Sequence, residues 1–131
     1  MPKILIVDDD ITITELMKAL VKTEGHEPTT VNDSLQAMEI AKSLNPDLIT
    51  LDLMMPGLTG FELCKLMHED PSFANTPIVI VSAKDDPESK EQAKQAGATD
   101  YLTKPFGLDE FINKIKPFVT KINGQQQAVT N

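Results

Sequence analysis

The chain has 131 residues, the length of one domain, and 40% of them are hydrophobic, which is enough to bury a core without disulfides or a structural metal. Its formal net charge is −8, and all 12 of its Lys/Arg positions are lysines. This composition argues against direct contacts with nucleic acid and against binding to an anionic membrane, because both need a basic face.

Strand-like and helix-like stretches alternate five times along the chain. The first strand is expected at residues 4–7. It is followed by a helix that Asp10 or Thr12 could cap and that Gly25 closes. One face of this helix is expected to carry its apolar residues, namely Ile13, Leu16, Met17, Leu20 and Val21. The histidines, His26 and His68, are expected on the surface.

The middle of the chain continues the alternation. The second strand, at residues 27–31, is more polar and contains a proline, which suits an edge strand because a missing donor is tolerated there. A helix at residues 34–44, a strand at 48–51 and a helix at 59–69 follow. The single cysteine, Cys64, excludes an internal disulfide, and its apolar neighbours predict a buried thiol.

The last third of the chain carries two more strand–helix pairs. A strand is expected at residues 78–81, a polar helix at 86–96 and a short strand at 101–102. The final helix has its apolar residues at Leu108, Phe111, Ile112 and Ile115. Pro117 should end or kink this helix near Lys116, because proline removes a backbone donor.

This order of elements predicts an α/β fold with a mostly parallel sheet. Residues 1–122 are expected to form the single domain, and residues 123–131 a flexible C-terminal tail or the stub of a linker. The N-terminus does not resemble a signal peptide, and no run approaches the roughly 18 apolar residues of a membrane helix. The expected compartment is the cytoplasm.

Acidic residues follow two of the expected strands, where an open parallel sheet binds its ligands. Asp8 and Asp9 end the first strand, and Asp52 ends the third. Three carboxylates at one edge repel one another, and Mg²⁺ would relieve that repulsion at an oxygen-only site. Taken alone, the acidic run at residues 8–10 could equally be a solvated turn with a helix cap; the position of Asp52 favours the metal site.

Asp52 ends a strand so apolar that a carboxylate there is costly unless it is used or paired. We interpret it as a nucleophile that forms an aspartyl phosphate. The turn after it could aim the Met54 carbonyl at the metal. Ser82 follows the fourth strand and could donate to a phosphoryl oxygen, and Lys104 offers a compact cation. Each of the last two, taken alone, is also a common turn or surface residue.

Four segments in this order and spacing resemble the receiver domain of response regulators in two-component signalling, over about residues 2–120. The segments are ILIVDDD (4–10), LDLMMPG (51–57), VIVSA (79–83) and GATDYLTKPF (97–106). The resemblance implies a flavodoxin-like, doubly wound sheet of five parallel strands in the order 2-1-3-4-5, flanked by five helices. It implies a signalling switch with weak self-catalysis rather than a metabolic enzyme.

The resemblance also implies a role for each site residue. Asp52 corresponds to the phosphoacceptor, and Asp8 and Asp9 correspond to Mg²⁺ ligands, with the Met54 carbonyl as a further ligand. Ser82 and Lys104 correspond to the hydroxyl and the cation that contact the phosphoryl group. Tyr101 corresponds to the aromatic that swings inward when Ser82 moves.

The implied partners are a histidine kinase or a histidine phosphotransfer protein as phosphodonor, and a downstream protein effector. The effector would bind the face made by the fourth helix, the fifth strand and the fifth helix. Within this face, we expect the effector to bind around Lys84, Glu88, Tyr101 and Lys104. Some members dimerise there through arginine salt bridges, which this chain lacks, so a monomer or a weak homodimer is expected.

Two other functions remain as alternatives. A phosphorylation-independent receiver-like scaffold would normally lack an acid or the lysine, and none is missing here. An aspartyl-phosphate hydrolase of another α/β family would want a second aspartate two residues after the nucleophile, where this chain has Met54. Nucleotide-binding loops are absent from the sequence.

Overall fold

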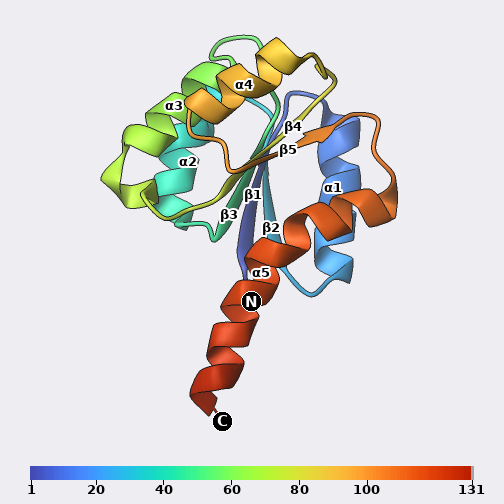
Figure 1. Ribbon diagram of the computed structural model, residues 1–131, viewed down its shortest axis with the longest axis vertical. Coiled ribbons are helices and arrows are strands. Elements are labelled where there is room, and N and C mark those ends of the chain that lie inside the picture. Colours follow the sequence, from blue (N-terminus) through green and yellow to red (C-terminus); the bar gives the residue numbers. More distant parts are fainter. Residues whose placement is uncertain (131) are drawn as a thin grey trace.

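The computed structural model describes the backbone of residues 1–130 and the side chains of residues 1–119. Its centre is a five-stranded sheet in which every neighbouring pair is parallel, in the order β2-β1-β3-β4-β5 (Figure 1). The strands are β1 (Lys3–Val7), β2 (Glu27–Val31), β3 (Leu48–Leu51), β4 (Ile78–Ser82) and β5 (Asp100–Thr103). The predicted strand order and edge position of β2 are confirmed.

Helices cover both faces of the sheet. They are α1 (Ile11–Thr23), α2 (Ala37–Leu44), α3 (Gly60–Glu69), α4 (Pro87–Gln95) and α5 (Leu108–Thr130), with short 3₁₀ turns η1 (Ser34–Gln36) and η2 (Pro71–Phe73). Figure 1 shows α1 and α5 on one side of the sheet and α2, α3 and α4 on the other. Each strand-to-helix connection at the upper edge is a loop, and these loops surround the acidic site.

Alternation along the strands divides the core into two layers. Leu5, Ile49 and Ile80 belong to the buried cluster that includes residues of α2, α3 and α4. Ile4 and Val79 belong to the cluster formed with α1 and α5. Because β1, β3 and β4 are buried on both faces, they are almost continuously apolar, whereas the edge strand β2 can be polar.

Side-chain caps fix where the helices begin. The Asp10 carboxylate accepts the backbone N–H of Ile13 at 3.3 Å, so Asp10 rather than Thr12 caps α1. A capping box that the sequence analysis did not identify opens α3, where the Thr59 hydroxyl accepts from the Glu62 N–H and the Glu62 carboxylate accepts from the Thr59 N–H. The capping box thus fixes the start of α3 directly after the loop that follows Asp52.

Two predictions about the first helix and the turn after it are wrong. His26 is 8% exposed rather than on the surface, because the chain turns back at Gly25 and the His26 N–H bonds to the Val21 carbonyl beneath the helix. Leu16 is 40% exposed, because the buried stripe of α1 is rotated toward Thr14. The amide of Asn32 donates to the Thr14 hydroxyl, which satisfies that buried polar group.

Pro117 lies inside the last helix, which runs to Thr130. Figure 1 shows α5 changing direction part-way along its length, which fits the predicted kink and not a helix end. Residues 123–130 continue this helix, and a flexible tail or linker stub over residues 123–131 stays a prediction. The domain boundary at residue 122 remains a prediction, and residue 131 lies outside the described part.

Candidate functional site: an acidic pocket at the carboxyl edge of the sheet

The predicted acidic residues converge at the upper edge of the sheet. The Asp8 N–H donates to the Val31 carbonyl at 3.1 Å and the Asp52 N–H donates to the Val7 carbonyl at 3.0 Å, so each aspartate directly extends a strand. One carboxylate oxygen from each of Asp8, Asp9 and Asp52 lies within 4.8 Å of the others. Oxygen-only donors at this spacing suit a hard divalent cation that keeps several waters.

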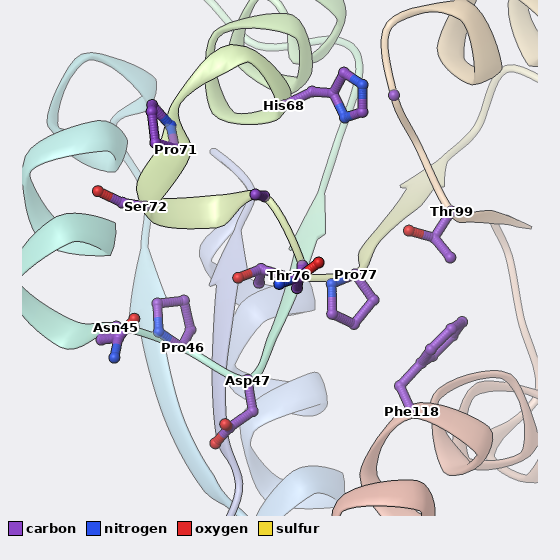
Figure 2. Close-up of a pocket in the computed structure, with 13 residues that line it drawn as sticks. Asn45, Pro46, Asp47, His68, Pro71, Ser72, Thr76, Pro77, Thr99 and Phe118 are labelled. Carbon is purple, nitrogen blue, oxygen red and sulfur yellow. The ribbon is translucent and has the colours of Figure 1, made fainter.

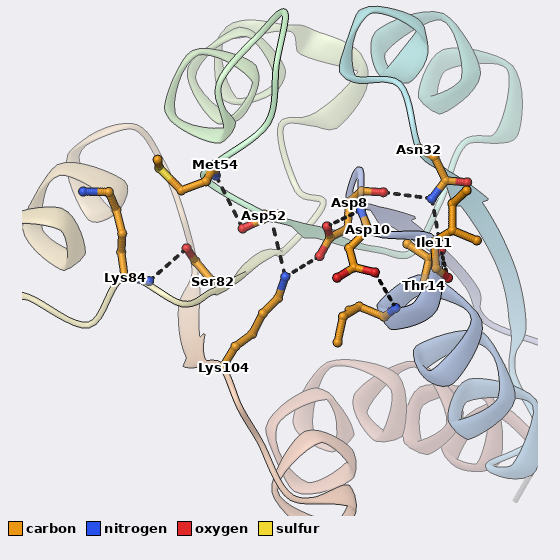
Figure 3. Close-up of polar contacts among 11 residues, drawn as sticks. Asp8, Asp10, Ile11, Thr14, Asn32, Asp52, Met54, Ser82, Lys84 and Lys104 are labelled. Carbon is orange, nitrogen blue, oxygen red and sulfur yellow. Dashed lines mark hydrogen bonds and ion pairs between the residues drawn. The ribbon is translucent and has the colours of Figure 1, made fainter.

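Lys104 reaches into the same pocket from the end of β5 (Figure 3). Its ammonium lies 2.5 Å from one carboxylate oxygen of Asp8 and 3.7 Å from one of Asp52. The Lys104 N–H donates to the Ser82 carbonyl at 2.8 Å, and the Lys104–Pro105 peptide bond is cis. One cation therefore faces three carboxylates, which leaves the pocket with excess negative charge.

Burial and repulsion change the acidity of Asp52. Its side chain is only 8% exposed. Burial, followed by the nearby charge of Asp8, raises the pKa of Asp52 to about 6, against the opposing effect of Lys104. A carboxylate held in this way is stabilised by any added cation, so the chemistry of the residues fits a Mg²⁺ ion.

Ser82 and Met54 lie on either side of Asp52. Ser82 is fully buried, and its hydroxyl oxygen accepts the Lys84 N–H at 3.3 Å. The Met54 N–H donates to the Asp52 carboxylate at 3.4 Å, while the Met54 side chain is 59% exposed at the mouth of the pocket (Figure 3). The predicted set of residues is thus brought together from four strand ends.

Supporting residues that the sequence analysis missed hold the loop after Asp52. The buried Ser34 hydroxyl donates to the Pro56 carbonyl at 2.8 Å and accepts the Leu58 N–H at 2.9 Å, which ties the loop to η1. Gly60 packs against the Asp52 backbone so closely that a Cβ there would meet the Asp52 carbonyl oxygen at 2.1 Å. Only the packing reveals these roles, because neither residue stands in a recognisable motif.

Tyr101 contacts the loop that follows Ser82. Its hydroxyl donates to the Lys84 carbonyl, and the Lys84 N–H in turn donates to the Ser82 hydroxyl. The Lys90 ammonium lies 5.7 Å from the centre of the Tyr101 ring. Burial is the main cause that raises the pKa of the Tyr101 phenol above its ordinary value. The backbone of Lys84 therefore links Ser82 to Tyr101.

A hollow of about 730 Å³ lies elsewhere in the molecule (Figure 2). Asp47 and Pro77, which line it, precede β3 and β4, whose other ends carry Asp52 and Ser82. Figure 2 shows His68, Thr99 and Phe118 spread around its wall. The hollow is therefore at the opposite edge of the sheet from the acidic pocket.

Comparison with known proteins identifies the family. The family model described as the response regulator receiver domain matches residues 4–116. The chain belongs to the response regulator receiver domain family. The DNA-binding dual master transcriptional regulator RpaA of Synechocystis is 34% identical to it, over 98% of this chain and 53% of RpaA. Protein PilG of Pseudomonas aeruginosa is 33% identical, over 89% of this chain and 87% of PilG.

Solved structures show the same receiver fold. Chemotaxis protein CheY4 of Vibrio cholerae matches with a TM-score of 0.86 and 32% identity, over 90% of this chain and 98% of that one. The receiver domain of sensor histidine kinase PA1611 from Pseudomonas aeruginosa, which has magnesium in its active-site cleft, matches with a TM-score of 0.83 and 27% identity, over 91% and 98%.

The chain is a receiver domain of the response regulator type, and its pocket of Asp8, Asp9 and Asp52 fits a phosphorylation site. It spans about half the length of RpaA and the related regulators that it matches. Among the described residues, no helix combines the length and apolar character needed to cross a membrane.

Proposed function

We propose that this receiver domain accepts a phosphoryl group on Asp52 from the phosphohistidine of a histidine kinase or a histidine phosphotransfer protein. The observation that carries the proposal is the convergence of Asp52, two further aspartates and Lys104 in one buried pocket. The proposal makes the chain a phosphorylatable switch in a two-component relay.

Asp8, Asp9 and Asp52 would hold Mg²⁺, with the Met54 carbonyl as a further ligand. The raised pKa of Asp52 and the spacing of the three carboxylates support this assignment, as does the magnesium ion in the related PA1611 domain. When bound, the ion neutralises the charge on the carboxylates and the phosphoryl oxygens. The protein's own residues supply the nucleophile and the remaining contacts.

In the transfer step a carboxylate oxygen of Asp52 attacks the phosphorus, the new O–P bond forms, and the P–N bond to the donor histidine breaks with its electron pair leaving on that nitrogen. Lys104, now paired mainly with Asp8, is placed to contact a phosphoryl oxygen on Asp52. The Ser82 hydroxyl can donate to another phosphoryl oxygen, which would weaken its bond from the Lys84 N–H.

A shift of Ser82 toward the phosphoryl group would also affect the proposed effector-binding face of the protein. Lys84 is bonded to Ser82 on one side and to Tyr101 on the other, so a shift of the loop changes the position of the tyrosine. The proposed effector site is the α4-β5-α5 face around Lys84, Glu88, Tyr101 and Lys104. The bound partner is a downstream protein.

The alternatives are less well supported. A phosphorylation-independent scaffold has no observation in its favour, since every acid and the lysine are in place. We propose a cytoplasmic switch, not a metabolic enzyme, that is a monomer or a weak homodimer. RpaA is DNA-binding and about twice as long, so the comparisons do not confirm the prediction of no nucleic-acid contact. The charge of −8 without arginine supports that prediction for this chain.

The decisive experiment is incubation with Mg²⁺ and a small phosphodonor such as acetyl phosphate, followed by intact mass. We expect the wild type to gain one phosphoryl group and Asp52→Ala to gain none. Asp47→Asn is the matched control, because Asp47 lies at the other end of β3 and asparagine keeps the acceptor for the Lys3 N–H. Phosphorylation of Asp52→Ala, or failure of the wild type with Mg²⁺, would refute the proposal.

Met54 should lengthen the life of the phosphoryl group. Its exposed, apolar side chain stands at the pocket mouth, where it cannot hold an attacking water by hydrogen bonding. We expect Met54→Asn to lose phosphate severalfold faster, because an amide can orient that water. Release of inorganic phosphate from the purified phosphoprotein measures the rate. Met54→Leu, which keeps an apolar side chain, should match the wild type, and equal rates for the asparagine variant would contradict the explanation.

A further inference from the structure

The face of α4 that packs against the rest of the protein carries small side chains and no large apolar ones. Its buried positions are Ser89 and Ala93, and neither is large. Lys90 is exposed and borders this stripe, directly after Ser89 and three residues before Ala93. The large side chain that meets this stripe from β5 is Tyr101, which packs against the buried cluster beside α4.

Besides its packing against the buried cluster, the Tyr101 side chain makes two contacts that act at different points. The hydroxyl donates to the Lys84 carbonyl in the β4–α4 loop. The Lys90 ammonium lies 5.7 Å from the ring centroid, within the range in which the face of an aromatic ring attracts a cation. The first contact belongs to the loop that follows Ser82, and the second belongs to α4 itself.

We infer that Lys90 is a positioning residue for the switch: its ammonium holds the Tyr101 ring against α4, so that a movement of the Ser82–Lys84 loop is transmitted to the helix. The inference rests on the proposed phosphorylation of Asp52 for its signalling role, but not for the contact itself. Without the Lys90 charge, Tyr101 would lose its electrostatic attraction to α4, and a movement of the loop would be transmitted to that helix less effectively.

The chain offers an unusually clean probe of this contact. Tyr101 is its single tyrosine and it has no tryptophan, so the tyrosine fluorescence reports on this side chain alone. Lys90→Met removes the charge and keeps a side chain of similar length. Lys94→Met is the matched control, because Lys94 lines the same small hollow beside Tyr101 one helical turn further on and makes no cation–π contact with the ring in the described structure.

The test begins without a phosphodonor. Acrylamide quenching of the tyrosine fluorescence should increase in Lys90→Met and stay at the wild-type level in Lys94→Met. Loss of an exposed cation–π contact should change the equilibrium constant between two conformers of Tyr101, one with the ring against α4 and one with the ring away from it, by about two- to fivefold. Equal quenching in the two variants would overturn the inference.

A double-mutant cycle separates the contact from a general effect on α4. Lys90→Met should lower the folding equilibrium constant about two- to fivefold when Tyr101 is present, and it should have no effect in a Tyr101→Leu background. Circular dichroism in urea measures both. An equal loss in the two backgrounds would show that Lys90 acts independently of the ring and would refute the inference.

The last arm adds Mg²⁺ and acetyl phosphate, with intact mass recorded on the same samples. The phosphorylated wild type and Lys94→Met should change their fluorescence, and Lys90→Met should take up phosphate equally but change less. Equal phosphate uptake with an unchanged fluorescence response would contradict the role of Lys90. Absence of phosphate uptake in every protein would instead refute the proposed phosphorylation. The quenching experiment and the double-mutant cycle would still show whether Lys90 holds the Tyr101 ring.

Discussion

Replacing Gly60 with alanine should lower the free energy of unfolding by about 3 kcal/mol. Gly60 is the first residue of α3, and its N–H donates to the Leu53 carbonyl at 3.0 Å. A Cβ at this position would lie 2.1 Å from the Asp52 carbonyl oxygen and 2.6 Å from the Leu53 Cα. Because both are backbone atoms at the end of a buried strand, no side-chain rotation can relieve the clash, and α3 must separate from the site loop.

Gly107→Ala is the matched control, since a Cβ there would have no atom within 4 Å. That substitution should be neutral or stabilise the protein by up to about 1 kcal/mol, because alanine restricts the unfolded chain. Urea unfolding followed by circular dichroism measures both variants. A Gly60→Ala protein within about 1 kcal/mol of the wild type would show that α3 can move away from Asp52 at little cost.

Replacing Asp52 with asparagine should stabilise the metal-free protein at pH 8 by about 1–2 kcal/mol, after allowance for solvent screening. The folded pKa of Asp52 is raised from 3.8 to about 6, mainly by burial and then by Asp8. Between these two values the unfolded chain loses its proton while the folded protein keeps it, so stability falls as the pH rises through this window. Above about pH 6 the full cost is present, and below about pH 4 it is absent.

The gain from Asp52→Asn should therefore be much smaller near pH 4, where the carboxyl is protonated in the folded protein and about half protonated in the unfolded chain. Saturating Mg²⁺ should also reduce the gain at pH 8, because the ion relieves the same repulsion in the wild type. Asp47→Asn, at the opposite end of β3, should change stability by less than about 0.5 kcal/mol at either pH. Urea titrations at pH 4 and pH 8, with and without Mg²⁺, measure these differences. A gain that is equal at both pH values would contradict the role assigned to the Asp52 charge.

The fold could be predicted from the sequence largely because the pattern along each strand depends on burial alone. β1, β3 and β4 are covered on both faces, so they contain almost continuous apolar runs, with Thr50 as the polar exception inside β3, and a polar residue marks the end of each run. Parallel strands bring those ends to one edge. This geometric rule, together with the resemblance to receiver domains, was enough to group Asp8, Asp52 and Lys104.

The errors arose where a residue's environment is set by a distant segment. His26 stands in a turn that looks exposed, but the turn folds back beneath α1 and buries it. At Pro117 the sequence left a helix end and a kink as alternatives, and in the structure α5 continues to Thr130. Local propensities are worth about 1 kcal/mol for an ordinary residue and about 3 kcal/mol for proline, and tertiary packing can override either.

The amino-acid sequence by itself determined the strand ends, the acidic edge and the family, because each follows from the order of residues along one strand or one motif. Only the tertiary structure decided that Gly60 must lack a side chain, that Ser34 ties the loop after Asp52 and that Lys90 faces the Tyr101 ring. Each of these contacts joins segments far apart in the sequence or on different elements. Their distances depend on how helices pack on the sheet, which no local pattern specifies.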